Sequence, residues 1–381
     1  MNFGILTENP SRERRVALTP AGVQALVAAG NHVYIEKDAG IASHFTNENY
    51  QSEGGTIVYT SDEVFGRSEV LLKTSSPTEA DCQRLLESQI LLSFLHLAVA
   101  KTKVMEILLR KRVCAIGYEL IENGRGDLPV LQVMSEIAGQ MSIQVAGRYL
   151  ESNNNGRGIV LGGIAGVLPA LVVIVGAGTV GQAATRSASG VGARVIVCDN
   201  DLSRLRWIEN RFNGHVGTVM ATEYNLTKIL RNADVVVGAV LIKGERAPHV
   251  VTEAMVKQMR PGSMVIDISI DQGGCVETSR PTTFENPTYL LHDVLHYCVP
   301  NMPAMVSRTA AYGMTNALLP YLMQIAEQGL DRAITENDGL ARGVCTYQGV
   351  CTQDAIARRF EMKSVDIKSL SATKGSSHAM A

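Results

Sequence analysis

The chain lacks several features that would place it in other classes of protein. Its 381 residues carry a formal net charge of −2, so there is no electrostatic case for nucleic acid or an anionic membrane as partner. No apolar run reaches the ~18–20 residues that a membrane helix needs. The nearest candidate, residues 159–175, is interrupted by glycines and by Pro169. Hydrophobic residues make up 46% of the chain, which indicates a globular rather than a disordered protein.

Two further patterns are missing. The N-terminus has no basic-then-apolar signal sequence, and the 7 cysteines show no C-x-x-C spacing. Some of them, such as Cys114 and Cys198, lie in strand-like runs. We therefore expect reduced thiols and a cytoplasmic location.

A glycine turn between two apolar strands is the most informative stretch. Residues 171–175 read as a buried strand, and Gly176, Gly178 and Gly181 fit the pattern G-x-G-x-x-G. In this pattern the first glycine allows the tight turn, the second admits a pyrophosphate, and the third lets the next helix pack closely. The N–H groups at that helix start would face the phosphates. The alternative is a glycine turn without a ligand; the strand before the turn, the helix after it and an acid at the expected distance favour nucleotide binding.

The acid that completes the pattern is Asp199, at the end of the strand 193–199. Its distance from the turn is close to the usual spacing of about 20 residues. A carboxylate there accepts hydrogen bonds from the ribose hydroxyls and repels a 2′-phosphate, so we expect NAD rather than NADP as cofactor. Arg194, Arg204 and Arg206 lie nearby and weaken that preference.

Strand and helix patterns alternate along most of the chain, which predicts an α/β fold with two doubly wound parallel-sheet domains and a cleft between them. We assign residues 1–130 and 305–362 to a substrate domain, 131–304 to a Rossmann-type NAD domain and 363–381 to a flexible tail. The helix from about Ser135 to Leu150 should join the two domains. Strands are expected at 3–6, 32–36, 56–59, 70–73, 89–96, 113–119, 171–175, 193–199, 233–241, 263–271 and 289–292.

Polar residues at predicted strand ends are candidates for chemistry, because α/β proteins bind ligands at that edge. His96 ends an apolar run and is able to exchange a proton near neutral pH, although a buried structural histidine is an equal alternative. Asp271 precedes two glycines at the mouth of the nucleotide-binding sheet. Asp267 would share its strand face, and the sequence does not decide whether Asp267 is catalytic or structural.

Cationic and metal-binding candidates are fewer. Arg15 follows the first strand and suits a substrate carboxylate, whereas a solvated surface role applies at least as well to Arg12 and Arg14. Lys73 ends a strand and would bind an anion or lie on the surface. His292 and His296 have a spacing compatible with zinc, but no third ligand is evident, so we expect no metal.

The motifs in their order resemble the alanine dehydrogenases, in the larger family that includes the NAD-binding component of proton-translocating transhydrogenase. The resemblance runs from Arg15 to about Pro303 and includes the glycine turn. The other matching stretches are RVALTPAG at 15–22, LSFLHLA at 92–98, MSEIAG at 134–139, DISIDQGGC at 267–275, SRPTT at 279–283 and NMP at 301–303.

This resemblance implies reversible oxidation of L-alanine by NAD to pyruvate and ammonium, in a homo-hexamer. It implies that Arg15 holds the substrate carboxylate, that His96 is the acid/base group and that Asp271 serves the water or ammonia step. It assigns NAD contacts to Ser135, Gly176, Ala177, Gly178, Thr179, Val180, Gly181, Asp199, Val240, Leu241, Ile268, Gln272, Asn301 and Met302.

One position departs from the family. Where the family has a second lysine that contacts the substrate, this chain has Ser75, two residues after Lys73. Lys73 and Ser75 remain the candidate substrate contacts of this segment. Alternative hypotheses are a different small amino acid or 2-oxo acid as substrate, a transhydrogenase-like module, or a non-catalytic NAD-binding protein.

Overall fold

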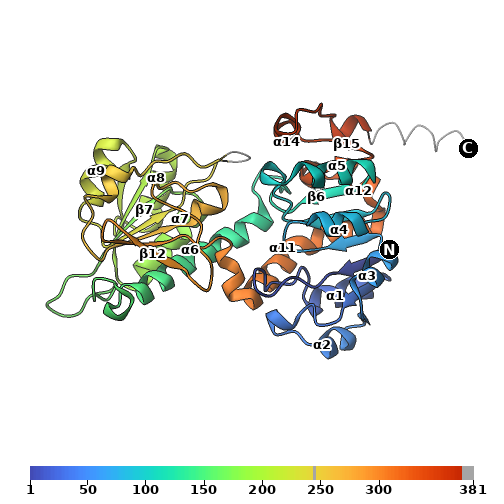
Figure 1. The fold of residues 1–381 in the computed structure, drawn as a ribbon, viewed down its shortest axis with the longest axis horizontal. Helices are drawn as coiled ribbons and strands as arrows, with labels where there is room; N and C mark the ends of the chain where they lie inside the picture. The colour runs from blue at the N-terminus through green and yellow to red at the C-terminus, as the bar shows by residue number, and fades with distance from the viewer. Residues whose placement is uncertain (243–245, 371–381) are drawn as a thin grey trace, which may run out of the picture. The chain divides into compact units, whose positions relative to one another are not determined.

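The computed structural model describes residues 1–242 and 246–370, and its chain divides into two compact units. Unit 1 comprises residues 1–134 together with the segment from residue 304 onward, and unit 2 comprises residues 135–303. Figure 1 labels their elements. Two elements pass from one unit to the other, the long helix α6 (Pro129–Tyr149) and the short 3-10 segment η5 (Met302–Val306).

Unit 1 is built on an eight-stranded sheet in the order β15-β14-β6-β5-β4-β1-β2-β3. The strands from β1 to β6 run parallel, and β14 and β15 add an antiparallel edge. The strands are β1 (Asn2–Ile5), β2 (His32–Glu36), β3 (Thr56–Val58), β4 (Val70–Leu72), β5 (Ile90–Ser93), β6 (Cys114–Gly117), β14 (Val344–Tyr347) and β15 (Val350–Cys351).

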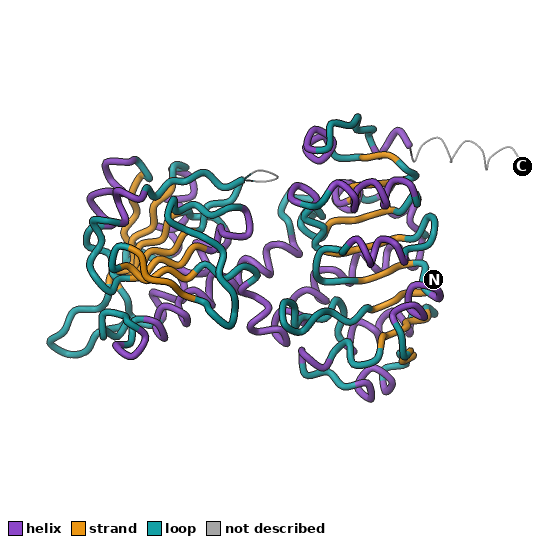
Figure 2. Tube along the Cα trace, viewed as in Figure 1, coloured by secondary structure: helices purple, strands orange, loops and turns teal. Residues whose placement is uncertain are grey.

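Helices cover both faces of this sheet, as Figure 2 shows. Their starts follow local sequence signals: the Thr60 side chain, for example, accepts a hydrogen bond from the Glu63 N–H at 3.2 Å and so caps α3. The helices are α1 (Pro20–Ala28), α2 (Asn47–Ser52), α3 (Ser61–Arg67), α4 (Glu79–Arg84), α5 (Thr102–Arg110), α11 (Ser307–Gln328), α12 (Leu330–Glu336), α13 (Asp338–Gly343) and α14 (Asp354–Arg359), with 3-10 turns η1 (Ile41–Ser43) and η2 (Leu97–Val99).

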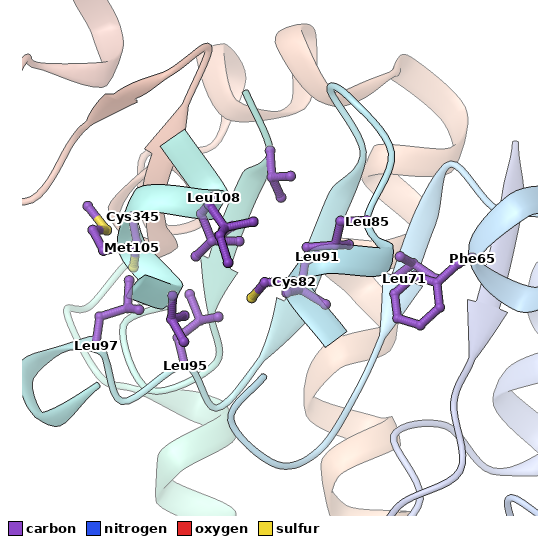
Figure 3. Packing of buried hydrophobic residues seen from close by; sticks show 14 of the residues in the cluster. Phe65, Leu71, Cys82, Leu85, Leu91, Leu95, Leu97, Met105, Leu108 and Cys345 are labelled. Atoms are coloured by element: carbon purple, nitrogen blue, oxygen red, sulfur yellow. The ribbon is translucent and has the colours of Figure 1, made fainter. Parts of the chain in front are cut away.

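The core of unit 1 forms because its central strands are apolar on both faces. All residues of β4, β5 and β6 are buried, as expected for parallel strands covered by helices on each side. Figure 3 shows one side of this core, where Leu71 and Leu91 from the sheet pack with Cys82 of α4 and Leu108 of α5. This rigid layer fixes the carboxyl ends of β1, β4, β5 and β6, where the candidate substrate residues follow.

Unit 2 contains a seven-stranded sheet in the order β12-β13-β11-β10-β7-β8-β9. The chain winds outward from β7 in both directions, so the β7–β10 boundary is the topological switch point at which α/β sheets bind ligands. Its elements are β7 (Leu171–Val175), β8 (Arg194–Asp199), β9 (Gly217–Met220), β10 (Val235–Gly238), β11 (Met264–Asp267), β12 (Thr288–Leu291), β13 (Val294–Tyr297), α7 (Thr179–Gly190), α8 (Leu202–Arg211), α9 (Glu223–Leu230), α10 (Glu253–Val256), η3 (Ser152–Asn154) and η4 (Ile268–Gln272).

The two doubly wound α/β sheets confirm the predicted fold class, but several strand predictions were wrong in extent. β11 ends at Asp267, and residues 268–272 form the 3-10 turn η4, so Asp267 and Asp271 do not share a strand face. β4 ends at Leu72, so Lys73 and Ser75 lie beyond the strand. The predicted strand at 289–292 is β12, which pairs antiparallel with β13. β11 ends where the backbone turns into η4, and β4 ends at its last apolar residue before Lys73.

The C-terminal segment is only partly described. Residues 371–381 of the predicted tail lie outside the described residues. Before them, the Val365 N–H donates to the Cys351 carbonyl at 2.9 Å, and Lys368 Nζ lies 2.8 Å from Asp338 Oδ1. Among the described residues, no helix combines the length and apolarity needed to cross a membrane.

Candidate active site

The glycine turn of unit 2 joins β7 to α7, and each glycine meets a different steric demand. Gly176 has φ +110°, and a Cβ there would lie 2.3 Å from the Ala239 carbonyl oxygen. A Cβ at Gly181 would lie 1.8 Å from the Gly176 carbonyl oxygen, so only glycine lets α7 pack this close. A Cβ at Gly178 would have Nη1 of Arg204, 4.0 Å away, as its nearest neighbour. Backbone at Gly178 is therefore open to a ligand, while the other two glycines shape the turn.

The start of α7 suits an anion. Gly178 is the N-cap of this helix, and no side chain caps it. Among the described residues, the first-turn N–H groups of Thr179 and Val180 have no N-cap side chain as acceptor, and they lie at the positive end of the helix dipole. Together with the open backbone at Gly178, this arrangement fits a dinucleotide pyrophosphate.

Asp199 lies beside the same turn, at the end of β8. It is only 6% exposed, and its carboxylate accepts hydrogen bonds from the Ala177 N–H at 2.6 Å and the Asp201 N–H at 2.8 Å. Arg204 Nη1 is 4.0 Å from Oδ2. The acid is thereby fixed next to the turn, where a carboxylate has lone pairs left for ribose hydroxyls.

The neighbouring strand ends of unit 2 are linked to each other. The Val240 N–H donates to Ser269 Oγ at 3.0 Å, and that hydroxyl donates to the Val240 carbonyl at 2.8 Å. Leu241 is 50% exposed and Ile268 is half-buried. Since β10 pairs with β7, these residues lie along the same edge as the glycine turn.

Helix α6 brings Ser135 towards the same region. A Cβ at Gly139 would lie 2.3 Å from the Val180 carbonyl oxygen, so α6 packs closely against the start of α7. Ser135 is one turn earlier on the same face of α6 and is half-buried. The helix face that carries Ser135 is therefore the one that meets the nucleotide turn.

Asp271 lies in η4 rather than on a strand, and it is exposed. Its Oδ1 accepts a hydrogen bond from the Asn301 N–H at 3.0 Å, and Asn301 itself has a left-handed backbone, with φ +57°. Gln272 has a buried Oε1 without a hydrogen-bond partner among the described residues, and Met302 is buried. The structure thus brings Asp271 and Asn301 together, with Gln272 and Met302 as their chain neighbours.

Asp267 has a structural environment. It is 1% exposed, and its Oδ2 accepts hydrogen bonds from the N–H groups of Cys275 and Val276 at 2.9 and 3.0 Å. Burial raises the pKa of this carboxyl, against the lowering effect of its hydrogen bonds. The carboxyl holds the glycine loop 273–276 to the end of β11, which answers the question that the sequence left open.

In unit 1, Arg15 and His96 both contact the ring of Phe94. The Arg15 guanidinium lies 5.4 Å from the Phe94 ring centroid, and the imidazole of His96 stacks on Phe94 at 5.9 Å and 13°. His96 is exposed and has φ +45°, and its N–H donates to Glu119 Oε1 at 2.6 Å. The backbone of His96 is thus fixed, while the residue stays exposed.

Arg15 is buried and partly neutralised. Its Nε and Nη2 donate to the two oxygens of Glu13 at 2.8 and 2.6 Å, and Nη1 contacts Met134 Sδ at 2.9 Å. A guanidinium has five N–H donors in a planar fork, so this pairing uses one edge of the fork and leaves further donors on the other. Glu13 therefore orients Arg15 without exhausting its capacity for a carboxylate.

Lys73 and Ser75 converge on Glu8, which is 7% exposed. The Lys73 ammonium donates to Glu8 Oε2 at 2.9 Å, and the Ser75 hydroxyl donates to the same oxygen at 2.5 Å. The N–H groups of Thr74 and Ser75 donate to Oε1 at 2.6 and 3.0 Å. Lys73 is thus an internal ion-pair partner rather than a solvated cation.

The two histidines with zinc-compatible spacing have other partners. His292 Nε2 lies 2.7 Å from Glu253 Oε1, and the ring nitrogens of His296 lie within hydrogen-bond distance of Thr278 Oγ1 and the Val294 carbonyl. Burial lowers the pKa of His296. Within residues 1–242 and 246–370, no group of three or more metal-binding side chains comes together.

Sequence reasoning missed Glu8, Glu13, Phe94 and Glu119, which organise the substrate residues. A signal existed for two of them: Glu8 follows the first strand, and Glu13 stands two residues before Arg15. Phe94 stands two residues before its stacking partner His96, whereas nothing local marks Glu119, because it meets residues 95 and 96 from beyond another strand.

Fold and site together define a two-unit α/β protein with a dinucleotide-binding turn in one unit and a histidine–arginine constellation in the other. Residues 4–138 match the family described as alanine dehydrogenase/PNT, N-terminal domain, and residues 142–354 match its C-terminal domain. The chain belongs to the alanine dehydrogenase/PNT family.

Relatives match over almost the whole chain. Alanine dehydrogenase from Methanococcus maripaludis is 44% identical over 95% of this chain and 97% of its own. The enzyme of that name from Mycobacterium tuberculosis is 42% identical over 94% of this chain and 96% of its own. A solved L-alanine dehydrogenase superposes with a TM-score of 0.90 at 39% identity, covering 95% of this chain and 99% of that one. A transhydrogenase from Sinorhizobium meliloti shares the fold. It superposes with a TM-score of 0.78 at 19% identity, covering 93% of this chain and 100% of that one.

Proposed function

We propose that this chain catalyses the reversible, NAD-dependent oxidative deamination of L-alanine to pyruvate and ammonium. Family membership and the names of relatives at 42–44% identity support the activity. The observation that carries the proposal is the constellation in unit 1, where an arginine and an accessible histidine share the Phe94 ring. A carboxylate clamp beside an acid/base group is the arrangement that an amino-acid dehydrogenase requires.

In this proposal Arg15 binds the substrate carboxylate through the N–H groups that Glu13 leaves available. His96 takes a proton from the substrate nitrogen or hydroxyl as the carbinolamine forms and breaks down, and returns it in the reverse direction. Stacking on Phe94 and the bond from the His96 N–H to Glu119 hold the imidazole in position. These contacts reduce the reorganisation that proton transfer would otherwise need.

Unit 2 would hold the dinucleotide. The turn from Gly176 to Gly181 receives the pyrophosphate, Asp199 binds the ribose hydroxyls, and Val240, Leu241 and Ile268 line the neighbouring strand ends. Bound NAD supplies the hydride acceptor. Asp271 would orient the water or ammonia, while Ser135, Gln272, Asn301 and Met302 position the nicotinamide.

Ser75 limits the expected efficiency with alanine. The family's second lysine would add a charged contact to the substrate, and losing such a contact costs about 1.5–3 kcal/mol. Lys73 does not replace it, because Glu8 already neutralises its ammonium at 2.9 Å. We therefore propose either weak alanine turnover or a substrate that gains from a serine at this position.

The test is a spectrophotometric scan of small amino acids with NAD, and of 2-oxo acids with ammonium and NADH. L-alanine and pyruvate should change the NADH absorbance, and no change with any compound would refute the proposal. NADH binding without turnover would instead identify a non-catalytic NAD-binding protein. Ser75→Lys should raise kcat/KM for alanine by about tenfold or more if the missing charge is the deficit.

We further propose that the protein acts in the cytoplasm as a homo-hexamer. All seven cysteines are free and buried, which is compatible with a reducing compartment. Sedimentation velocity of the purified chain tests the assembly, and a monomer or dimer as the dominant species would contradict it.

A further inference from the structure

The Ser75 hydroxyl has its single proton committed inside the protein. It donates to Glu8 Oε2 at 2.5 Å, while the backbone N–H of the same residue donates to Oε1. A hydroxyl has one O–H donor and two acceptor lone pairs. Since Ser75 is only half-buried, its oxygen presents acceptor capacity alone to any ligand that reaches it. It therefore favours a donor, such as an ammonium, over a carboxylate or carbonyl oxygen.

The charge around Ser75 points the same way. The Lys73 ammonium lies between two carboxylates, 2.9 Å from Glu8 and 3.8 Å from Asp81, and is 7% exposed. The nearby cation Arg15 is matched by Glu13. Arg12 and Arg14 share the Arg15 loop but are exposed, so solvent screens their charge. The local balance is negative and favours a cation.

Two more polar groups at this place lack partners. Thr74 Oγ1 and the Tyr118 hydroxyl are buried, with no hydrogen-bond partner among the described residues. The Thr74 N–H donates to Glu8, and the Glu8 charge adds to the burial that raises the pKa of Tyr118, so both groups lie close to Glu8. Both residues are fully buried, so among these oxygens it is the Ser75 hydroxyl, on a half-buried residue, that a ligand meets first.

This acceptor cluster adjoins the candidate catalytic groups. The Phe94 N–H donates to the Thr74 carbonyl at 3.3 Å, and the Ser76 hydroxyl donates to the Phe94 carbonyl at 2.9 Å. Phe94 contacts both Arg15 and His96, and Tyr118 packs edge-on against it at 5.4 Å. Ser75 therefore follows directly on Thr74, the residue that is bonded to the Phe94 backbone.

We propose that the Ser75 hydroxyl oxygen, oriented by Glu8, forms an acceptor subsite for a second ammonium group, so that small diamino acids of the 2,4-diaminobutyrate and ornithine type are substrates. This inference rests on the proposed dehydrogenase function and names its substrate class. The reaction balances as for alanine: the Cα–H leaves as hydride to NAD, water supplies the carbonyl oxygen, and the α-amino group leaves as ammonium with release of one proton. The side-chain ammonium stays unchanged and serves recognition only.

The experiment compares pairs of amino acids of equal shape, in which a methyl group replaces the side-chain ammonium. L-2,4-diaminobutyrate is paired with L-norvaline, and L-ornithine with L-norleucine, with L-alanine measured in parallel. In at least one pair, kcat/KM should favour the diamino acid by about tenfold or more, as expected for one charge-assisted contact. If alanine reacts but both apolar analogues equal or exceed their partners, the subsite is refuted while the dehydrogenase function stands. If nothing reacts, the proposed function itself fails.

Variants locate the effect. Ser75→Ala removes the acceptor and should lower the diamino-to-apolar ratio by about tenfold, whereas Ser75→Thr keeps a hydroxyl and should retain most of it. Ser76→Ala is the matched control, since its hydroxyl bonds to the Phe94 carbonyl and not to Glu8. NADH titration and thermal unfolding of each variant establish that it is folded. An unchanged ratio in a folded Ser75→Ala variant would overturn the assignment.

Discussion

A methyl group added at Gly181 should disrupt the dinucleotide turn. In the structure its Cβ would lie 1.8 Å from the Gly176 carbonyl oxygen, 2.9 Å from the Gly176 carbonyl carbon and 3.4 Å from Ile174 Cγ2. The two closest atoms belong to the backbone of the turn, so no flexible side chain is able to move aside. Helix α7 must therefore shift away from β7, or the turn must open.

The magnitude follows from overpacking. Inserting a methyl group into a packed core costs about 1–3 kcal/mol, and the upper end applies here because the obstacle is backbone. For a unit of this size, about 3 kcal/mol lowers the melting temperature by roughly 6–12 °C. A displacement near 1 Å at the turn should also lower kcat/KM for NAD by about a hundredfold.

Gly190→Ala provides the matched control, because it makes the same change in the same helix. A Cβ at Gly190 meets nothing within 4 Å, and its φ is not in the left-handed region. Alanine there should stabilise the helix by up to about 1 kcal/mol and leave NAD kinetics unchanged. Trp207 in α8 is the single tryptophan of the chain, so its fluorescence reports the unfolding of unit 2.

Thermal unfolding followed by Trp207 fluorescence, with NADH titration, measures both effects. Equal melting temperatures and equal NADH affinities for Gly181→Ala and Gly190→Ala would refute the reasoning. Such a result would mean that α7 has room which the structure does not show.

Three further predictions address other parts of the site. Arg15→Lys should lower kcat/KM for L-alanine by about 10–100-fold at unchanged NADH affinity, because lysine lacks the planar fork that pairs with Glu13. Arg14→Lys on the same loop is the control and should have no effect. Equal losses of kcat/KM for the two variants in steady-state assays would refute the role of Arg15 in binding the substrate carboxylate. Asp199→Ser should raise kcat/KM with NADP, relative to kcat/KM with NAD, by at least about tenfold, because it removes the charge that repels a 2′-phosphate. An unchanged ratio of the two values would exclude ribose recognition by Asp199. Burial lowers the pKa of His296 in the folded protein below the ordinary value of 6.5, so the unfolded state binds this proton more readily. The free energy of unfolding should therefore fall as the pH drops below about 6.5 and through the lower pKa of the folded state. The melting temperature of His296→Gln should depend less on pH over that range, and an equal dependence would contradict the assignment.

The nucleotide turn was predictable because its demands are local. Gly176, Gly178 and Gly181 stand at fixed intervals between an apolar strand and a helix, and backbone sterics allow few other residues there. Asp199 follows from the same unit, since the next parallel strand ends at the same edge. Each of these inferences uses residues that lie close in sequence.

The partners of the substrate residues were not predictable in the same way. Glu8 and Ser75 are far apart in the chain, and their hydrogen bond exists only because β1 and β4 are neighbours in the sheet. The sequence alone left Lys73 as either an anion-binding or a surface residue, whereas the structure pairs it with the buried Glu8. Asp271 was expected on a strand because the apolar run continues past Asp267, but the backbone turns into η4 there.

The sequence by itself determined the alternation of strands and helices, the glycine turn and the identity of the groups available for chemistry, because each depends on neighbours along the chain. Only the tertiary structure decided which charges are neutralised, which hydroxyls donate or accept, and which acid supports a loop rather than a reaction. Hydrogen bonds and burial depend on the order of strands in space, and that order is set by the packing of the whole unit.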